Sequence, residues 1–456
     1  MKILILTHFY PPERIGGTET YTHNLAKELV HLGNEVQVFC AGGWERGDNY
    51  WNGYSDKVFE NVSVRALNLN WTRAPEVNKY LYHNPVVERF LSEFLAEIRP
   101  DIVHVTSCNT LSSSVLRVVK QAGVPLVVTL TDFWFICPRV TLLRNDGSNC
   151  DGRVVEWDCL ECLWSGSKVY RWSRRILPSP TAEHLLTSIS RNAPLARWPG
   201  LRGMAIDIRD RRTKLNQALG FADRVLIASQ SARSLFRNSG FSIPIVVVPY
   251  GHDLSWLGSY QGKTPSSSVR FGFIGQIAPM KGPLLLIEAF RKLNQSGNAR
   301  LLVYGDLKKN PVYSRSLKAS ANGCSKIEFR GTYPHSESSG VFSEIDVLVV
   351  PSLWHDYPLI INEAFATRTP VIASDFGGMR ESVQHEVNGL LFERGNVQDL
   401  RRQLSRVITE PELLNHLRNG IPPVKTMRQA GGEMVGIYRD VLSKEENRRS
   451  FAEKAG

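Results

Sequence analysis

The sequence predicts an α/β protein built from two doubly wound domains, each with a mostly parallel sheet. Short runs rich in Val, Ile and Leu alternate with helix-like segments in two successive series. A polar, linker-like stretch at residues 261–268 (QGKTPSSS) separates the two series. The runs are apolar at consecutive positions, which is typical of parallel strands that are buried on both faces. A chain of 456 residues is long enough to form two such cores.

The expected strands give the domain bounds. The first series comprises residues 3–7, 36–39, 102–106, 126–130, 225–228 and 245–248, and the second comprises 269–274, 301–304, 327–329, 347–350, 371–373 and 390–392. Between the first two runs, apolar residues from Tyr21 to Leu32 have helical spacing, and Gly33 is placed to end that helix. We therefore expect an N-terminal domain over 1–260, a C-terminal domain over 268–430 and a last helix over about 433–456. A Cys-containing and basic insert, about 133–215, interrupts the first domain.

Composition restricts the class of protein. Hydrophobic residues make up 42% of the chain and charged residues 22%, as in globular proteins rather than disordered or membrane-embedded ones. The net charge of +11 favours anionic partners such as nucleotides, phospholipid surfaces or pyrophosphate-linked lipids. No motif that reads nucleic acid is present, so nucleic acid is not an expected partner. Without a signal peptide or an apolar run of about 20 residues, we expect a cytoplasmic protein. Its basic insert is either a solvated surface or a patch that contacts the inner face of a membrane or docks the acceptor.

Four loops that follow expected strands carry the candidate chemistry. The first holds Gly16 and Gly17 directly before a helix, where backbone amides and the helix dipole favour an anion. The second runs from Gly275 to Gly282 and places Gln276 and Lys281 before the next helix, where Lys281 is a suitable charge for a diphosphate.

The third loop follows the strand 347–350. Leu359 and Ile360 would present free amides at a helix start, and Glu363 could hydrogen-bond a ribose diol, although a carboxylate there also complements the helix dipole. The fourth loop, after the strand 371–373, contains Gly377 and Gly378.

In order, these elements read GG…GQxxxxKG…PSLW(x)nE…GGxxE…NGLLF, and they resemble the retaining glycosyltransferases of family 4, the group 1 glycosyl transferases with the GT-B fold. The resemblance implies two Rossmann-like domains facing a cleft. It also implies transfer of a hexose-type sugar from a nucleoside diphosphate sugar to a saccharide or lipid-linked acceptor, in polysaccharide or glycolipid synthesis. No cofactor is required for catalysis in such enzymes.

By position, the resemblance places Gly16 and Gly17 near the diphosphate and the acceptor, and Gly377 and Gly378 near the sugar. Lys281 would pair with the diphosphate and Glu363 would bind the ribose. The terminal helix resembles the family's last helix, which packs back on the first domain.

Three positions depart from the family pattern. Gln276 stands where the family usually has Arg, which replaces a charge with a weaker hydrogen bond. The family's paired glutamates lie eight positions apart, but the residue eight before Glu363 is a histidine, and the nearest carboxylate is Asp356. We expect Asp356 to serve the sugar hydroxyls through a one-residue deletion in the loop. Thr131 replaces the histidine of a His–Asp pair, which leaves Asp132 at the catalytic edge. These departures keep a non-catalytic GT-B homologue open, beside a sugar-nucleotide epimerase or phosphorylase on the same fold.

Four cysteines follow Asp132 and lie within one stretch of 26 residues: Cys137, Cys150, Cys159 and Cys162. Four thiols could hold a structural zinc ion or an iron–sulfur cluster, although their spacing matches no standard zinc ribbon. Reduced thiols and a redox disulfide are the alternatives. The remaining three cysteines stand alone in the sequence, as small core residues do.

Overall fold

The computed structural model describes residues 1–42, 49–75, 77–153, 156–165, 181, 188, 204–293, 298–355 and 357–455. The chain forms two compact units. Unit 1 comprises Met1–Ala228, Arg233–Tyr250 and Met427–Gly456, and unit 2 comprises Ser229–Ala232 and Gly251–Thr426. Much of the predicted insert, including half of its basic residues, lies outside the described residues. No described helix is both long enough and apolar enough to cross a membrane.

Unit 1 is built on an eight-stranded sheet in the order β3-β4-β2-β1-β5-β6-β7-β8. Its strands are β1 (Lys2–Thr7), β2 (Glu35–Ala41), β3 (Trp51–Phe59), β4 (Val62–Leu69), β5 (Ile102–Val105), β6 (Leu126–Leu130), β7 (Arg224–Ile227) and β8 (Ile245–Val247). All neighbours pair in parallel except β3 and β4, which form an antiparallel hairpin that the sequence series did not include. Its helices are α1 (Gly17–His31), α2 (Val77–Tyr80), α3 (Pro85–Ile98), α4 (Ser114–Gln121), α5 (Glu156–Trp164), α8 (Met204–Leu219), most of α9 (Gln230–Asn238) and α17 (Met427–Ala455), with a 3-10 turn η1 (Trp71–Arg73).

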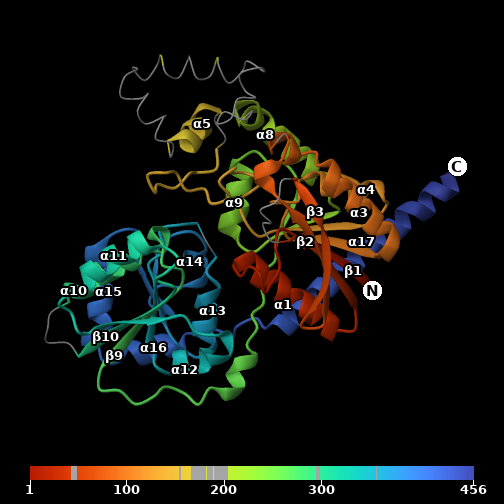
Figure 1. Cartoon of the computed structure of the whole chain (residues 1–456). Helices are drawn as coiled ribbons and strands as arrows, with labels where there is room; N and C mark the ends of the chain where they lie inside the picture. The colour runs from red at the N-terminus through yellow and green to blue at the C-terminus, as the bar shows by residue number, and fades with distance from the viewer. Residues whose placement is uncertain are drawn as a thin grey trace. The chain divides into compact units, whose positions relative to one another are not determined.

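The last helix, α17, packs beside α1 in unit 1 (Figure 1). The Tyr438 hydroxyl lies 2.7 Å from His104 Nδ1, and His104 Nε2 lies 2.7 Å from the Thr129 hydroxyl. Burial lowers the pKa of His104 to about 3, so this imidazole is neutral at physiological pH. The helix begins at Met427, six residues before the predicted start at 433.

Unit 2 has a six-stranded, fully parallel sheet in the order β11-β10-β9-β12-β13-β14. The strands are β9 (Val269–Ile274), β10 (Ala299–Tyr304), β11 (Ile327–Gly331), β12 (Val347–Val350), β13 (Val371–Ser374) and β14 (Gly389–Phe392). The helices are α10 (Pro283–Arg291), α11 (Pro311–Ala321), α12 (Ser338–Ser343), α13 (Leu359–Ala366), α14 (Gly377–Ser382), α15 (Val397–Thr409) and α16 (Leu413–Asn419), with 3-10 turns η3 (Ser255–Ser259), η4 (Pro279–Lys281) and η5 (His335–Glu337).

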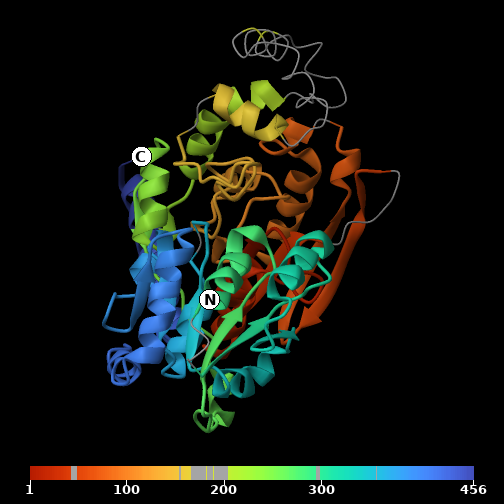
Figure 2. The same ribbon diagram turned by 90° about the vertical axis from the view of Figure 1, so that its left-hand side faces the viewer.

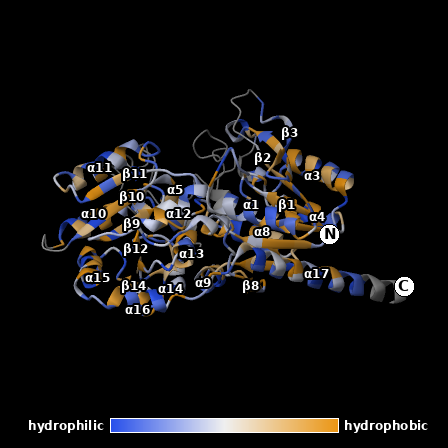
Figure 3. Ribbon diagram, turned by 90° about the horizontal axis from the view of Figure 1, so that it is seen from below, coloured by the Kyte–Doolittle hydropathy of each residue, from blue (hydrophilic) through white to orange (hydrophobic). Residues whose placement is uncertain are grey.

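Helices cover both faces of the unit 2 sheet. Val347 and Val349 pack in one core with helices α10, α11 and α15, whereas the intervening Leu348 and Val350 pack in another with α12, α13 and α14. Successive side chains of a strand point to opposite faces, so the two cores lie on opposite sides of the sheet. Figure 3 shows hydrophobic residues on the strands and helices of both units. The doubly wound, parallel-sheet prediction is confirmed for each unit.

The structure assigns residues 251–260 to unit 2, whereas the sequence placed them in the first domain. The reason is packing. Trp256 is buried and stacks on Phe342 of α12, with ring centroids 5.5 Å apart. The His252 amide also donates to the Lys425 carbonyl at 3.0 Å, which joins the start of the segment 251–426 to its end. The polar stretch that looked like a linker therefore follows the boundary instead of forming it.

Candidate functional site

The strand order of unit 2 reverses between β9 and β12, because β9 leads to β10 on one side while β12 pairs on the other. Doubly wound sheets bind ligands at such a switch point, beyond the carboxyl ends of the strands. The loop that follows β9 carries Lys281, and the loop that follows β12 leads into α13, which carries Glu363. The two loops meet at this edge. Two of the four predicted loops therefore come together where the fold places a ligand.

Gly282 makes the contact between these two loops possible. Its φ is +70°, in the left-handed region that favours glycine, and a Cβ atom there would lie 2.0 Å from the Pro351 carbonyl oxygen. The Leu353 amide donates to the Met280 carbonyl at 2.8 Å, which ties the loops together one residue before Lys281.

Replacing Gly282 with Ala should destabilise the protein by about 3 kcal/mol, because left-handed strain and a backbone clash add together. Gly323→Ala is the matched control. Its φ is +78°, but nothing lies within 4 Å of the added Cβ. Chemical denaturation should therefore show a loss of only about 1 kcal/mol for the control. Equal losses in the two variants would mean that the contact between the loops contributes nothing.

The Lys281 ammonium lies over the ring of Trp354, 5.1 Å from its centroid. Such a cation–π contact stabilises the positive charge and orients the ammonium group. Gln276, five residues earlier, is exposed. The structure therefore places Lys281 against the loop that follows β12 and leaves the side chain of Gln276 at the surface.

Helix α13 begins at Leu359, with Pro358 as its N-cap, so the amides of Leu359 and Ile360 lie in its first turn as predicted. Glu363 lies one turn further along. Burial raises the pKa of Glu363; His335 opposes this and Asp253 adds to it. The site therefore disfavours the charged form of this carboxyl. A ligand that donates hydrogen bonds to it would stabilise the carboxylate and offset the free energy of burying its charge. Asp356 lies outside the described residues.

The loop after β13 lies next in the sheet. Gly377 begins α14 with a φ of +55°, and Gly378 is buried. Phe376, the residue before them, contacts the His355 ring at a centroid distance of 4.3 Å, and the Arg394 guanidinium lies 4.2 Å from its centroid. These contacts connect the loops after β12, β13 and β14 along one edge.

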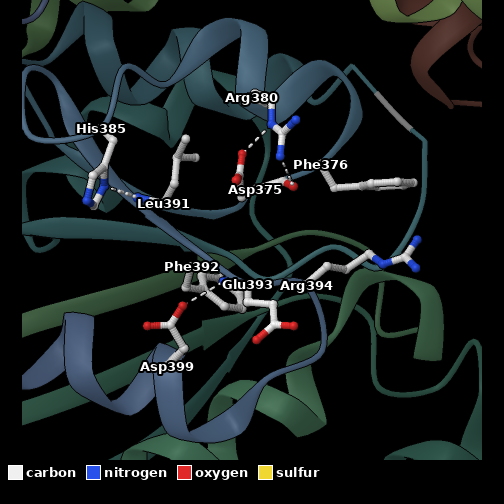
Figure 4. Close-up of a pocket in the computed structure, with 9 residues that line it drawn as sticks. All are labelled: Asp375, Phe376, Arg380, His385, Leu391, Phe392, Glu393, Arg394 and Asp399. Atoms are coloured by element: carbon white, nitrogen blue, oxygen red, sulfur yellow. Dashed lines mark hydrogen bonds and ion pairs between the residues drawn. The ribbon is translucent and has the colours of Figure 1, made fainter.

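A cavity of about 570 Å³ opens beside the loop that follows β13 (Figure 4). Figure 4 shows Arg380 paired with Asp375, and Arg394 extended beside Phe376. The lining residues are Asp375, Phe376, Arg380, His385, Leu391, Phe392, Glu393, Arg394 and Asp399. Neither Lys281 nor Glu363 is among them, so this cavity neighbours the predicted donor residues but does not contain them.

Unit 1 has its own switch point, between β1 and β5. His8 directly follows β1, and its Nε2 lies 3.3 Å from Glu19 Oε1 in the first turn of α1. Burial raises the pKa of Glu19, but the hydrogen bond and charge of His8 outweigh it, so the pKa is lowered overall. Sequence reasoning did not single out His8 or Glu19; a polar residue directly after the strand and a carboxylate in the first turn were the available signals.

Asp132 lies after β6 at the same edge, within electrostatic range of both His8 and Glu19. Its carboxylate accepts from the Trp134 amide at 2.9 Å. Burial raises the pKa of Asp132; the charge of His8 and the hydrogen bonds from Trp134 and Ser107 oppose this rise without cancelling it. A partly buried carboxyl with a raised pKa suits a group that accepts a hydrogen bond or a proton from a hydroxyl.

Thr131 and Gly16 have structural partners of their own. The Thr131 hydroxyl accepts from the Thr18 hydroxyl at 3.0 Å and donates to the Thr106 carbonyl at 2.7 Å, which joins α1 to the ends of β5 and β6. A Cβ on Gly16 would lie 2.6 Å from Glu19 Oε2, whereas nothing lies within 4 Å of a Cβ on Gly17. The first glycine therefore makes room for a carboxylate at the start of α1, and an anion approaching there would meet that charge.

All seven cysteines lie in the described part of the chain, and none forms a disulfide there. Cys40 and Cys108 are buried, and the other five are partly buried. Among the described residues, no group of three or more His, Cys, Asp or Glu side chains is already placed to hold a metal ion. The four-cysteine site stays a prediction.

Comparison with known proteins identifies the family. Residues 16–251 match the glycosyl transferase 4-like domain, and residues 261–422 match glycosyl transferases group 1. The chain belongs to the group 1, family 4-like glycosyltransferases. The predicted resemblance is therefore confirmed, and the two matched regions correspond closely to the two units.

Individual relatives are distant. An uncharacterized 42.6 kDa protein in the cps region of Klebsiella pneumoniae is 23% identical over 389 residues, covering 84% of this chain and 87% of the relative. The putative glycosyltransferase YtcC of Bacillus subtilis is 31% identical over 185 residues, or 38% of this chain. The chain matches only 45% of that protein, and 44% of another relative, from Methanocaldococcus jannaschii.

The solved structures establish the fold alone. HepE of Anabaena, in complex with UDP and glucose, superposes with a TM-score of 0.58 at 16% identity, covering 96% of this chain and 99% of HepE. At this identity the similarity does not transfer a ligand.

Proposed function

We propose that this chain is a retaining glycosyltransferase that moves a hexose-type sugar from a nucleoside diphosphate sugar to a saccharide or lipid-linked acceptor. One observation carries the proposal. At the switch point of unit 2, Lys281 lies on the loop after β9, and the loop after β12 leads into α13 with its first turn and Glu363. The two loops are held together through Gly282 and Pro351. These groups suit, in turn, a diphosphate, its neighbouring oxygens and a ribose diol.

Their contribution would be electrostatic. As the bond from the sugar to the diphosphate breaks, negative charge grows on the leaving phosphate oxygens. Lys281 and the α13 amides are fixed in advance of this charge, so they would stabilise the transition state more than the ground state. Glu363 would hold the ribose and so fix the position of the diphosphate against Lys281.

The proposed transfer forms one bond and breaks one. The acceptor hydroxyl oxygen bonds to the anomeric carbon on the face that the diphosphate leaves, and the carbon–phosphate-oxygen bond breaks. The acceptor proton passes to the leaving phosphate oxygen, which gives a glycoside with retained configuration and a nucleoside diphosphate. In unit 1, Asp132 would orient the sugar or acceptor hydroxyl, and Asp356 would serve the sugar hydroxyls.

The relatives support the choice of substrate class. HepE was solved with UDP and glucose, so UDP-sugars are the first donors to test. The Klebsiella relative comes from a cps region, which supports an acceptor in polysaccharide synthesis. We infer a cytoplasmic protein whose basic insert can meet the inner face of a membrane when the acceptor is lipid-linked.

A non-catalytic homologue is the second candidate. It is favoured by Gln276, which is exposed where a cation would serve the diphosphate, and by Thr131, whose hydroxyl is engaged with Thr18 and Thr106. A binding protein of this kind would take up nucleotide without turnover. A phosphorylase would instead consume inorganic phosphate, and an epimerase would change the sugar without releasing nucleotide.

Thermal-shift and calorimetric titration with UDP-, GDP-, ADP-, CMP- and dTDP-sugars tests the proposal. One nucleotide series should stabilise the protein, and Glu363→Gln should weaken that binding by about tenfold or more, because a charge-assisted hydrogen bond contributes about 1.5–3 kcal/mol. Glu288→Gln, on the exposed face of α10, is the matched control and should bind like the wild type.

Turnover with the selected donor then separates the candidates. Nuclear magnetic resonance of the product should show a retained anomeric configuration with release of nucleoside diphosphate. Stabilisation without turnover would favour the non-catalytic homologue, and failure of every nucleotide to bind folded protein would refute the donor site.

A further inference from the structure

One buried nitrogen at the ligand edge of unit 1 has no role in the proposed transfer. It belongs to His8, which directly follows β1 at the switch point between β1 and β5. Among the residues that the structure describes, none forms a hydrogen bond with His8 Nδ1, although this atom is buried. A buried polar atom without a partner costs free energy, so folded proteins rarely contain one without a functional reason.

The backbone of His8 is fixed on both sides of β1. Its carbonyl accepts from the Ala41 amide, at the end of β2, and from the Thr110 hydroxyl, which follows β5, at 3.2 Å in each case. Figures 1 and 2 both show α1, in red, beside the first strands of this sheet. His8 is therefore held between the end of a central strand and the start of α1, where doubly wound sheets bind ligands.

The other ring nitrogen of His8 has a partner. Its Nε2 lies 3.3 Å from Glu19 Oε1, and the two side chains are only 13% and 10% exposed. Because an ionised carboxylate only accepts hydrogen bonds, this pair places a hydrogen on Nε2. In the neutral ring, Nδ1 then carries a lone pair and accepts a hydrogen bond. The group that completes the site is therefore a donor, such as a hydroxyl.

Hydroxyl groups of the chain at the same edge have already given their hydrogens. The Thr18 hydroxyl donates to the Thr131 hydroxyl at 3.0 Å, and Thr131 donates to the Thr106 carbonyl at 2.7 Å. A hydroxyl has one hydrogen to donate, so neither Thr18 nor Thr131 has one left for His8. The donor to Nδ1 is then a hydroxyl from solvent or from a substrate.

The same edge carries the proposed catalytic carboxyl. Asp132 follows β6, and His8 lies within electrostatic range of it. The hydrogen bond between Thr18 and Thr131 also joins the residue before Glu19 to the residue before Asp132. A sugar bound at this switch point, which carries several hydroxyls, could therefore meet the carboxyl and the imidazole together.

We propose that His8 Nδ1 accepts a hydrogen bond from a hydroxyl of a sugar substrate, and that His8 selects substrates that carry this hydroxyl. The assignment rests on the proposed transfer and deepens it. The hydroxyl is not the one that reacts, because the reacting hydroxyl gives its proton to the leaving phosphate oxygen. It belongs to the donor sugar or to the acceptor. A substrate without it would leave Nδ1 buried and unpaired, so discrimination should be strong.

Two substitutions separate the two ring nitrogens. The amide of glutamine lies nearly where Nε2 lies, so His8→Gln keeps a donor for Glu19 and removes the Nδ1 acceptor. The amide of asparagine lies near the position of Nδ1, so His8→Asn keeps an acceptor there and loses the contact with Glu19. We expect kcat/KM for transfer to fall about 3- to 10-fold in His8→Gln and to recover partly in His8→Asn, although His8→Asn should be the less stable variant.

His31→Gln is the matched control, because that exposed histidine of α1 also lies near a carboxylate, 3.9 Å from Glu28. It should keep wild-type turnover and stability. A purely structural His8 would give the opposite ranking, with turnover following stability in both His8 variants. That ranking, or wild-type turnover in His8→Gln, would overturn the assignment.

Calorimetry shows which substrate carries the hydroxyl. If the donor sugar carries it, His8→Gln weakens binding of the nucleotide sugar and leaves binding of the nucleoside diphosphate unchanged. If the acceptor carries it, both affinities stay unchanged and KM for the acceptor rises. Monodeoxy analogues of that substrate then identify the group, since one analogue should be discriminated against by the wild type and not by His8→Gln.

Nuclear magnetic resonance of ¹⁵N-histidine in the full chain separates this assignment from the proposed function. The signals that disappear in His8→Gln belong to His8. They should show hydrogen on Nε2 and a lone pair on Nδ1, and the Nδ1 signal should shift when glucose, galactose or mannose is added. Hydrogen on Nδ1, or a signal that no hexose and no nucleotide sugar moves, would overturn the role of His8. A signal that hexoses move in a protein that binds no nucleotide would overturn the donor site instead.

Discussion

Replacing Lys281 with Met should lower kcat/KM for transfer by about 10²–10³, because the variant loses the positive charge that, in the proposed site, would face the leaving diphosphate. Methionine keeps most of the length of the side chain and can still pack on Trp354, so the fold should survive. The affinity for free nucleoside diphosphate should fall with the rate, since the product carries the charge that develops in the transition state. Steady-state kinetics and calorimetry with the selected donor give both quantities.

Three further variants sharpen the Lys281 experiment. Lys318→Met removes an exposed lysine of α11 in the same unit and should leave both quantities unchanged. Lys281→Arg should recover part of the loss, because it restores the charge but not the geometry. Trp354→Leu should lower kcat/KM about 2- to 30-fold, since the cation–π contact that orients the ammonium contributes about 0.5–2 kcal/mol. Wild-type turnover in Lys281→Met would remove this residue from the site.

The importance of Trp354 could not be predicted from the sequence, although its motif could. Pattern alone placed Lys281 before one helix and Glu363 in another, because strand and helix periods mark where loops begin. The ring contact depends on the order of strands in the sheet, which brings the loop after β12 beside the loop after β9. Strand order is a tertiary property, and no local signal of residues 275–282 contains it.

The first domain shows the opposite case, in which a correct motif received an incomplete interpretation. Gly16 was predicted to let backbone amides approach a ligand. In the structure, the absence of a Cβ atom at Gly16 makes room for the Glu19 carboxylate, which forms a pair with His8. A glycine at a helix start indicates close approach but does not say what approaches. The β3–β4 hairpin was also missed. Its antiparallel pairing departs from the series of buried parallel strands on which the prediction was based.

Asp132→Asn should separate stability from activity. Asparagine has the same shape, and its carbonyl oxygen can still accept from the Trp134 amide. We expect turnover to fall by about 10²–10⁴, the usual range for losing a group that accepts a proton or orients a hydroxyl. We also expect the variant to be more stable than the wild type at neutral pH, because it no longer buries a charge.

The pH dependence follows from the direction of the pKa shift. Burial raises the pKa of Asp132 in the folded protein above its usual value of about 4 in the unfolded chain. The folded state therefore holds the proton more tightly, and the wild type loses stability as pH rises from about 4 through the folded pKa. The variant has no such loss. The stability difference should be absent at low pH, should grow through that window, and should then stay constant. The acidic limb of the pH–kcat/KM profile should mark the same raised pKa in the wild type.

Asp146→Asn supplies the control, because that exposed carboxylate makes the same turn with a residue two positions on, accepting from the Ser148 amide at 2.8 Å. Hydrogen bonds from the Ser148 hydroxyl and amide lower the pKa of Asp146, so its replacement should not stabilise the protein and should leave turnover unchanged. If Asp132→Asn gained stability and kept its activity, the carboxyl would be a buried charge without a catalytic role. A loss of both stability and activity in Asp132→Asn would show that the carboxylate holds the loop together, because removing a structural carboxylate destabilises the fold.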